Sequence, residues 1–93
     1  MAKYVITRSV TAENQFTDGV DLQGYFNISI SGTWAATVTL QRSFNDGSAW
    51  LDVDTRTANT EEYGLEPEDD VQYRIGVKSS EFTSGTVVLR LSQ

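Results

Sequence analysis

The stretch that decides the fold of this 93-residue chain is Trp34-Ala35-Ala36-Thr37-Val38-Thr39-Leu40-Gln41-Arg42-Ser43-Phe44. Apolar residues occupy the even positions from Trp34 to Leu40 and again at Phe44, and polar residues alternate with them after position 36. Only Arg42 departs from the pattern. Apolar residues that recur at every second position lie on one face of a β-strand. The stretch therefore predicts a half-buried strand.

The residues around this strand predict a sheet protein. Asn45-Asp46-Gly47-Ser48 has the composition of a tight turn, because Asn, Asp and Gly tolerate positive φ, and it should close a hairpin with residues 50–57. No segment sustains the 3.6-residue period of an amphipathic helix. The sequence therefore predicts an all-β fold, namely a single immunoglobulin/fibronectin type III-like β-sandwich of about seven antiparallel strands spanning residues 1–93. Further alternating segments lie at residues 3–10, 22–31, 60–63, 71–77 and 87–91.

The segment from Leu65 to Ile75 predicts a corner between the two sheets. Pro67 is the only proline, and a proline marks a connection outside any central strand. Leu65-Glu66-Pro67 followed by Tyr73 resembles the fibronectin-type corner, in which the tyrosine hydroxyl bonds to the corner backbone. We expect the chain to change sheets here, and the strands at 71–77 and 87–91 to form a terminal hairpin.

The composition argues against most kinds of catalysis. The chain has no cysteine, which excludes disulfides, thiol nucleophiles and thiolate zinc sites, and no histidine, the usual general base near neutral pH. We therefore expect no enzymatic activity and no cofactor. The net charge of −6 predicts no nucleic-acid partner. Without an apolar signal segment or membrane span, the chain is expected to fold in a cytoplasm with no membrane partner.

Two groups of carboxylates are candidates for chemistry. The first group is six carboxylates between positions 61 and 70. Oxygen ligands at this density could attract calcium, but no Asp-x-Asp-x-Asp-Gly loop organises them, and a solvated acidic corner is the plainer interpretation. The second group is Asp52 and Asp54, which alternate with Leu51 and Val53 and should share one exposed face as solubilising residues rather than as an acid/base pair. The first group consists of Glu61, Glu62, Glu66, Glu68, Asp69 and Asp70.

Five residues are candidates for binding a partner. Trp50 falls in the polar phase of its strand, where it either pairs with Phe44 across the turn or offers a stacking surface to a sugar or a protein. The outward positions of the last two strands hold three of the seven basic residues, and these predict either a solvated face or a docking face for an acidic protein. Phe82 would then be an apolar anchor. The predicted contact residues are Trp50, Arg74, Lys78, Phe82 and Arg90.

Two segments give the chain a resemblance to a known group. Residues 31–50 and the runs 73–78 and 84–91 resemble small β-sandwich virion accessory proteins of tailed bacteriophages. The resemblance implies a non-enzymatic protein that decorates the capsid or belongs to the tail or fibre, made in the host bacterial cytoplasm and located in the virion. It implies capsid or tail proteins as partners and a homo-oligomer. The alternative is a carbohydrate-binding or adhesive module that binds a glycan through Trp50, Asp52 and Asp54.

Overall fold

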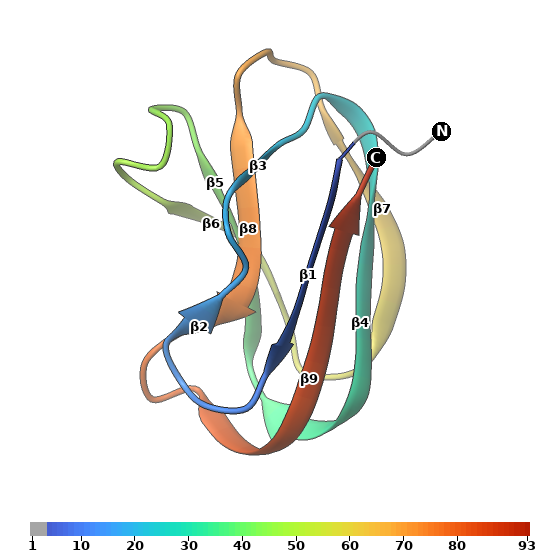
Figure 1. Cartoon of the computed structure of the whole chain (residues 1–93), viewed down its shortest axis with the longest axis vertical. Helices are drawn as coiled ribbons and strands as arrows, with labels where there is room; N and C mark the ends of the chain where they lie inside the picture. Colours follow the sequence, from blue (N-terminus) through green and yellow to red (C-terminus); the bar gives the residue numbers. More distant parts are fainter. Residues whose placement is uncertain (1–3) are drawn as a thin grey trace.

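The computed structural model describes residues 4–93, and these form two antiparallel β-sheets packed face to face. The predicted all-β sandwich is confirmed (Figure 1). No helix in residues 4–93 is long and apolar enough to cross a membrane. The strands are β1 (Val5–Val10), β2 (Gln15–Phe16), β3 (Val20–Asp21), β4 (Gly24–Ala36), β5 (Val38–Ser43), β6 (Leu51–Arg56), β7 (Thr60–Glu66), β8 (Gln72–Val77) and β9 (Phe82–Ser92).

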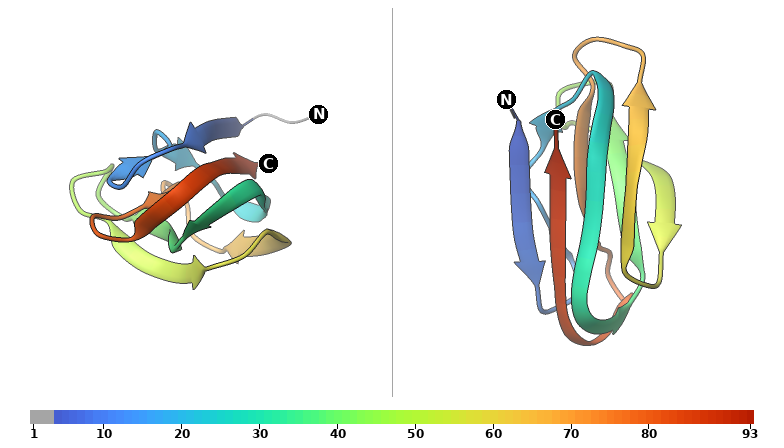
Figure 2. Two further views of the ribbon diagram at one scale, coloured as in Figure 1. Left: turned by 90° about the horizontal axis from the view of Figure 1, so that it is seen from below. Right: turned by 90° about the vertical axis from the view of Figure 1, so that its right-hand side faces the viewer.

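The order of the strands is that of a jelly roll. Sheet A has the order β1-β9-β4-β7, and sheet B has the order β2-β8-β5-β6 with β3 also paired to β8. The chain passes from sheet A to sheet B between β4 and β5 and returns between β8 and β9. The pair of β4 and β9 in sheet A therefore continues as the pair of β5 and β8 in sheet B. The right-hand view of Figure 2 looks onto sheet A, with its four strands side by side.

Of three sequence-based expectations about connections, two are confirmed and one is wrong. The turn over residues 45–48 does close a hairpin between β5 and β6, and the chain does change sheets between β7 and β8. The expected terminal hairpin is wrong, because β8 lies in sheet B and β9 in sheet A. Alternation shows which residues of a strand face inward, but it does not specify the neighbouring strand.

The core lies between the sheets and follows the predicted alternation. On sheet A, Ile28 of β4 lies opposite Leu91 of β9, and Ile30 lies opposite Leu89; all four are buried. Trp34 is only partly buried against this core, and its Nε1 donates a hydrogen bond to Asn59 Oδ1 at 2.7 Å. The buried apolar side chains are Val10, Leu22, Phe26, Ile28, Ile30, Val38, Leu40, Val71, Tyr73, Ile75, Val77, Val87, Leu89 and Leu91.

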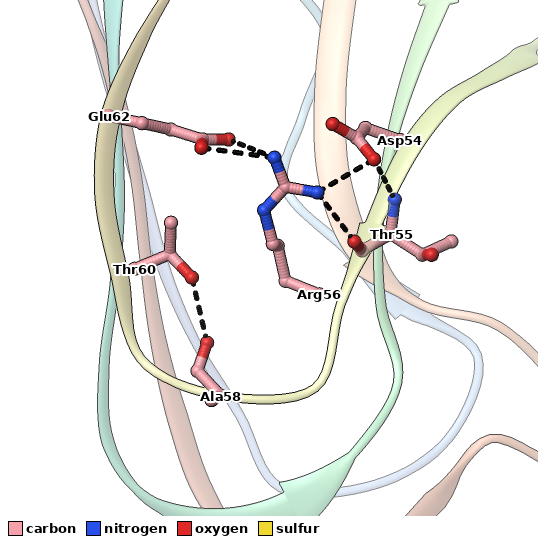
Figure 3. A network of polar contacts seen from close by, with 6 residues as sticks. All are labelled: Asp54, Thr55, Arg56, Ala58, Thr60 and Glu62. Atoms are coloured by element: carbon pink, nitrogen blue, oxygen red, sulfur yellow. Dashed lines mark hydrogen bonds and ion pairs between the residues drawn. The ribbon is translucent and has the colours of Figure 1, made fainter.

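Arginine side chains connect the two sheets at both open sides of the sandwich. Arg8 of β1 stands in the inward phase and donates a hydrogen bond to the carbonyl oxygen of Phe16, in β2 of the other sheet, at 2.6 Å. On the opposite side, Arg56 of β6 binds both carboxylate oxygens of Glu62 in β7 at 2.9 and 3.0 Å and Asp54 at 2.7 Å (Figure 3). The hydrogen bond from Arg56 lowers the pKa of Asp54 below its usual value. Each open side therefore carries a polar link over the core.

An irregularity in the β5–β6 hairpin separates Asp52 from Asp54. Leu40 lies opposite Asp54 and Gln41 opposite Asp52, so Val53 is an extra residue, which is the count of a β-bulge. Asp52 consequently lies on the outer face of sheet B, whereas Asp54 turns inward to Arg56. The expectation that these two carboxylates share a face is wrong.

The corner between the sheets differs from the fibronectin-type motif. The Tyr73 hydroxyl donates a hydrogen bond to Glu66 Oε1 at 2.6 Å, not to the corner backbone as predicted. Glu66 is only 2% exposed, and it also accepts hydrogen bonds from Arg42 Nη1 at 3.3 Å and from the Glu68 backbone N–H at 3.0 Å. Arg42, the one exception in the alternating pattern, therefore stands in the inward phase because it pairs with a buried carboxylate.

The Tyr73 hydroxyl should make the free energy of unfolding depend on pH in the alkaline range. Burial, reinforced by the hydrogen bond to Glu66, raises the pKa of Tyr73 to about 12, whereas an unfolded tyrosine has a pKa of about 10. Since the folded-state pKa is the higher one, stability should be complete below pH ~10 and should fall as the pH rises towards ~12. Thermal unfolding across this range checks the prediction. The Tyr73→Phe variant should lose this part of the pH dependence, and parallel curves for the two proteins would contradict it.

Candidate functional site

The structure divides the predicted contact residues between opposite sides of the molecule. Arg74 lies in β8 and Lys78 directly after it, both on the outer side of sheet B, whereas Arg90 lies in β9 of sheet A. The expectation that these three basic residues share one face is wrong, because it depended on the terminal hairpin. Phe82 begins β9 and packs, partly buried, against the core, so it is not the exposed anchor that was expected.

Arg74 is held between two aromatic rings on the outer face of sheet B. Its guanidinium carbon lies 4.2 Å from the ring centroid of Phe16 and 4.5 Å from that of Trp50. Trp50 thus packs on Arg74 rather than on Phe44, whose ring instead contacts Arg42 at 4.9 Å. The expected pair of Trp50 and Phe44 is wrong. Stacking on two rings holds Arg74 in place and covers one side of the indole that a sugar would need.

Hydrogen bonds extend this cluster along sheet B. Arg74 Nε donates to Gln41 Oε1 at 2.8 Å, and Gln41 Nε2 donates to Asp52 Oδ1 at 2.8 Å. Lys78 Nζ lies 2.5 Å from the other carboxylate oxygen of Asp52, and this hydrogen bond lowers the pKa of Asp52. These contacts join β8, β5 and β6 to one another. The charges of Asp52 and Lys78 are therefore matched within the molecule.

The outer face of sheet A is different, because large side chains project from it into solvent. Tyr63 is 71% exposed, Tyr25 67% and Leu65 55%. The strand register places Tyr25 of β4 opposite Leu65 of β7, and the two tyrosine rings meet edge to face with centroids 5.8 Å apart. We call the outward side chains of sheet A, centred on these three residues, the tyrosine face. It corresponds to the near side of the sheet in the right-hand view of Figure 2.

Two charged residues border a shallow groove on the tyrosine face. Ser29 of β4 lies at the floor of this groove, opposite Glu61 of β7 on one side and Arg90 of β9 on the other. Ser29 Oγ donates a hydrogen bond to Glu61 Oε2 at 2.6 Å. Within residues 4–93, Arg90 is the only arginine whose side chain makes no hydrogen bond, ion pair or ring contact. Arg90 is therefore available to a group outside the chain.

Sequence reasoning missed Tyr25, Tyr63 and Leu65. A signal was present, since Tyr25 stands in the polar phase of a strand whose buried positions are Phe26, Ile28 and Ile30. A large aromatic residue in an outward position is a stronger indication of binding than a charge, because charged outer faces are common and interface centres are enriched in tyrosine. Only the strand order, however, shows that the outward residues of β4, β7 and β9 form one surface.

The acidic residues of the corner do not gather around a common point. Glu66 is buried beside Tyr73, Glu62 binds Arg56, and Glu61 accepts from Ser29. In the part of the chain that the structure describes, no three carboxylates are arranged to hold a metal ion.

No protein family, no curated protein and no solved structure matches this chain.

Proposed function

We propose that the protein is a non-enzymatic structural component of a bacteriophage virion that binds other proteins of the capsid or tail. The observation that carries this proposal is the tyrosine face. Interface centres are depleted in charge and enriched in tyrosine and arginine, and this face presents Tyr25, Tyr63 and an arginine without an internal partner, Arg90. On the other outer face, that of sheet B, Lys78 pairs with Asp52, and Arg74 is held by Gln41 and two aromatic rings.

A resemblance in sequence and the small size of the domain also favour a virion role. The chain resembles phage accessory proteins over residues 31–50, 73–78 and 84–91, and the jelly-roll order also occurs in viral capsid domains, which is an argument by analogy. A small domain that occupies many equivalent sites on a particle can stabilise it even when each contact is weak, because binding to the assembled state shifts the equilibrium by mass action.

Truncation of both tyrosines should remove the protein from particles. In the variant Tyr25→Ser/Tyr63→Ser the loss of exposed rings leaves the core unchanged, whereas losing an aromatic anchor from an interface typically costs about 2 kcal/mol. We expect more than tenfold lower occupancy, measured by quantitative mass spectrometry of purified virions relative to the major capsid protein. Phe44→Ser, which alters an exposed ring in the loop directly after β5 of sheet B, is the matched control and should keep normal occupancy.

The same measurement separates the parts of the proposal. Wild-type copy numbers close to those of the major capsid protein would indicate decoration of the shell, and far fewer copies would indicate the tail or fibre. Normal occupancy of the double tyrosine variant would contradict the tyrosine face as the contact. Absence of the wild-type chain from virions would contradict the virion role itself.

A carbohydrate-binding function is the second candidate, favoured by the exposed rings of the tyrosine face. The residues first predicted to bind a glycan are engaged elsewhere, since Trp50 packs on Arg74 and Asp52 binds Lys78. Tyr63 and the neighbouring Asn27 instead offer a ring for stacking and an amide for hydroxyl groups. Titration with a broad glycan panel, followed by tyrosine fluorescence, tests this function. A flat response would count against it.

A further inference from the structure

The two charges of the tyrosine face are placed symmetrically about strand β4. In the register of sheet A, Ser29 of β4 lies opposite Arg90 of β9 on one side and opposite Glu61 of β7 on the other. The two flanking strands are two strand spacings apart, which is about 10 Å. Arg90 and Glu61 therefore stand at equal distances on either side of β4 and make no ion pair with each other among the described contacts.

We infer that the tyrosine face binds the tyrosine face of a second copy of the same chain. The two-fold axis of this dimer lies between the facing A sheets of the two copies and runs parallel to β4. This inference rests on the proposed use of the face as a protein interface and narrows its occupant. The face then meets a second copy of the chain in the virion rather than a different capsid or tail protein. Rotation about such an axis places β9 of each copy over β7 of the other. Arg90 of each copy then faces Glu61 of the other copy, so the contact contains two equivalent ion pairs.

The charges select this axis over the alternative that lies in the same plane. An axis across the strands at the level of Ser29 would place Arg90 on Arg90 and Glu61 on Glu61, and like charges in contact cost several kcal/mol. The axis along β4 pairs opposite charges in both places. The face is thus complementary in charge to a second copy of itself in one orientation. A symmetric dimer requires this property, whereas binding to an unrelated partner does not.

The shape and charge of the rest of the face suit the same arrangement. Midway along β4 the outward residues are small, Ser29 and Ser31, which lets the two copies approach there, and Ser29 forms the floor of the groove between Arg90 and Glu61. Tyr25 lies on β4, so its two copies meet near the axis. Each whole chain carries a charge of −6 and repels its copies, but this pair of residues contributes one positive and one negative charge.

A pair of single charge reversals tests the inference through the mutual dependence of the two residues. We expect wild-type protein to dimerise in a concentration-dependent manner in analytical ultracentrifugation. Arg90→Glu alone and Glu61→Arg alone should each weaken self-association at least tenfold, because each places like charges at both contacts. A one-to-one mixture of the two variants should form a heterodimer, since each carboxylate of the first protein then faces a guanidinium of the second.

The combined variant Arg90→Glu/Glu61→Arg provides a second check. It exchanges the two charges within each chain and should dimerise within about threefold of wild type, because opposite charges again meet. Thermal unfolding of every variant distinguishes loss of association from loss of folding, and a structural role within one chain would not produce the heterodimer.

The outcomes distinguish this inference from the proposed function. Wild-type protein that stays monomeric up to about 1 mM, or a mixture of the two single variants that stays monomeric, would overturn the two-fold contact. If particle occupancy still fell in the Tyr25→Ser/Tyr63→Ser variant, the proposed virion role would stand and the face would bind another virion protein. If the Tyr25→Ser/Tyr63→Ser variant kept normal occupancy on particles while charge reversal disrupted the dimer, the two-fold contact would be supported. The tyrosine face would then not be the surface that attaches the protein to the virion.

Discussion

Replacement of Glu66 by alanine is expected to lower the free energy of unfolding by about 3 kcal/mol, the largest effect for any carboxylate of this protein. Glu66 is 2% exposed and accepts hydrogen bonds from the Tyr73 hydroxyl, from Arg42 and from the Glu68 backbone. Its removal leaves the buried hydroxyl without an acceptor and opens a cavity at the corner. In a domain of this size, a loss of about 3 kcal/mol lowers the melting temperature by more than about 10 °C.

Two further variants show whether the buried contacts of Glu66 cause the expected fall in melting temperature. Glu68→Ala removes an exposed carboxylate from the same corner and should change the melting temperature little. Glu66→Gln keeps one acceptor oxygen for Tyr73 but turns an amide N–H towards the Glu68 N–H, so an intermediate loss is expected. Equal melting temperatures for Glu66→Ala and Glu68→Ala would contradict this account of the corner.

Replacement of Gly76 by alanine should destabilise the fold by a similar amount, about 3 kcal/mol, for a different reason. A Cβ atom at this position would lie 2.5 Å from Phe16 Cα and closer still to the carbonyl oxygen of Gln15. Both are backbone atoms of β2, so no rotamer change can relieve the clash. We expect β2 to separate from β8, which would also remove the Phe16 ring from Arg74 and change the fluorescence of the neighbouring Trp50.

The matched control is a glycine that lacks close neighbours. Gly24 has a φ of +75°, but no atom lies within 4 Å of the point that a Cβ would occupy, so Gly24→Ala should cost only the backbone term of about 1–2 kcal/mol. It should leave Trp50 fluorescence unchanged. If Gly76→Ala is no more harmful than Gly24→Ala, the close approach of β2 does not matter to stability.

The sequence predicts the inward faces of this fold well and the neighbours of each strand poorly. The alternation in β4, β8 and β9 does identify core residues, because burial of one face imposes a period of two. It cannot distinguish a hairpin of β8 and β9 from two strands in opposite sheets, since the inward sets are the same in both cases. The one irregular residue, Arg42, needed the buried Glu66 for its explanation.

The candidate site was missed for the same reason. Arg74 and Arg90 occupy equivalent outward positions in sequence, yet they lie on opposite sides of the sandwich. Tyr25 and Tyr63 are 38 residues apart in the chain and meet only because β4 pairs with β7. The bulge that separates Asp52 from Asp54 has no signal in the hairpin sequence. Surfaces made from several strands depend on pairing, which local patterns do not encode.

The inward-turned charges at the sheet edges have a consequence for aggregation. Arg8 stands at the β1 edge, Arg56 and a bulge at the β6 edge, and Glu62 at the β7 edge, while the edge strands β2 and β3 have two residues each. Inward charges, bulges and very short strands each prevent a neighbour from adding a further strand, the step that begins fibril growth. The protein can therefore be crowded at high local concentration without polymerising through its edges. If copies associate as proposed for the tyrosine face, they would meet through the broad faces rather than through the strand edges.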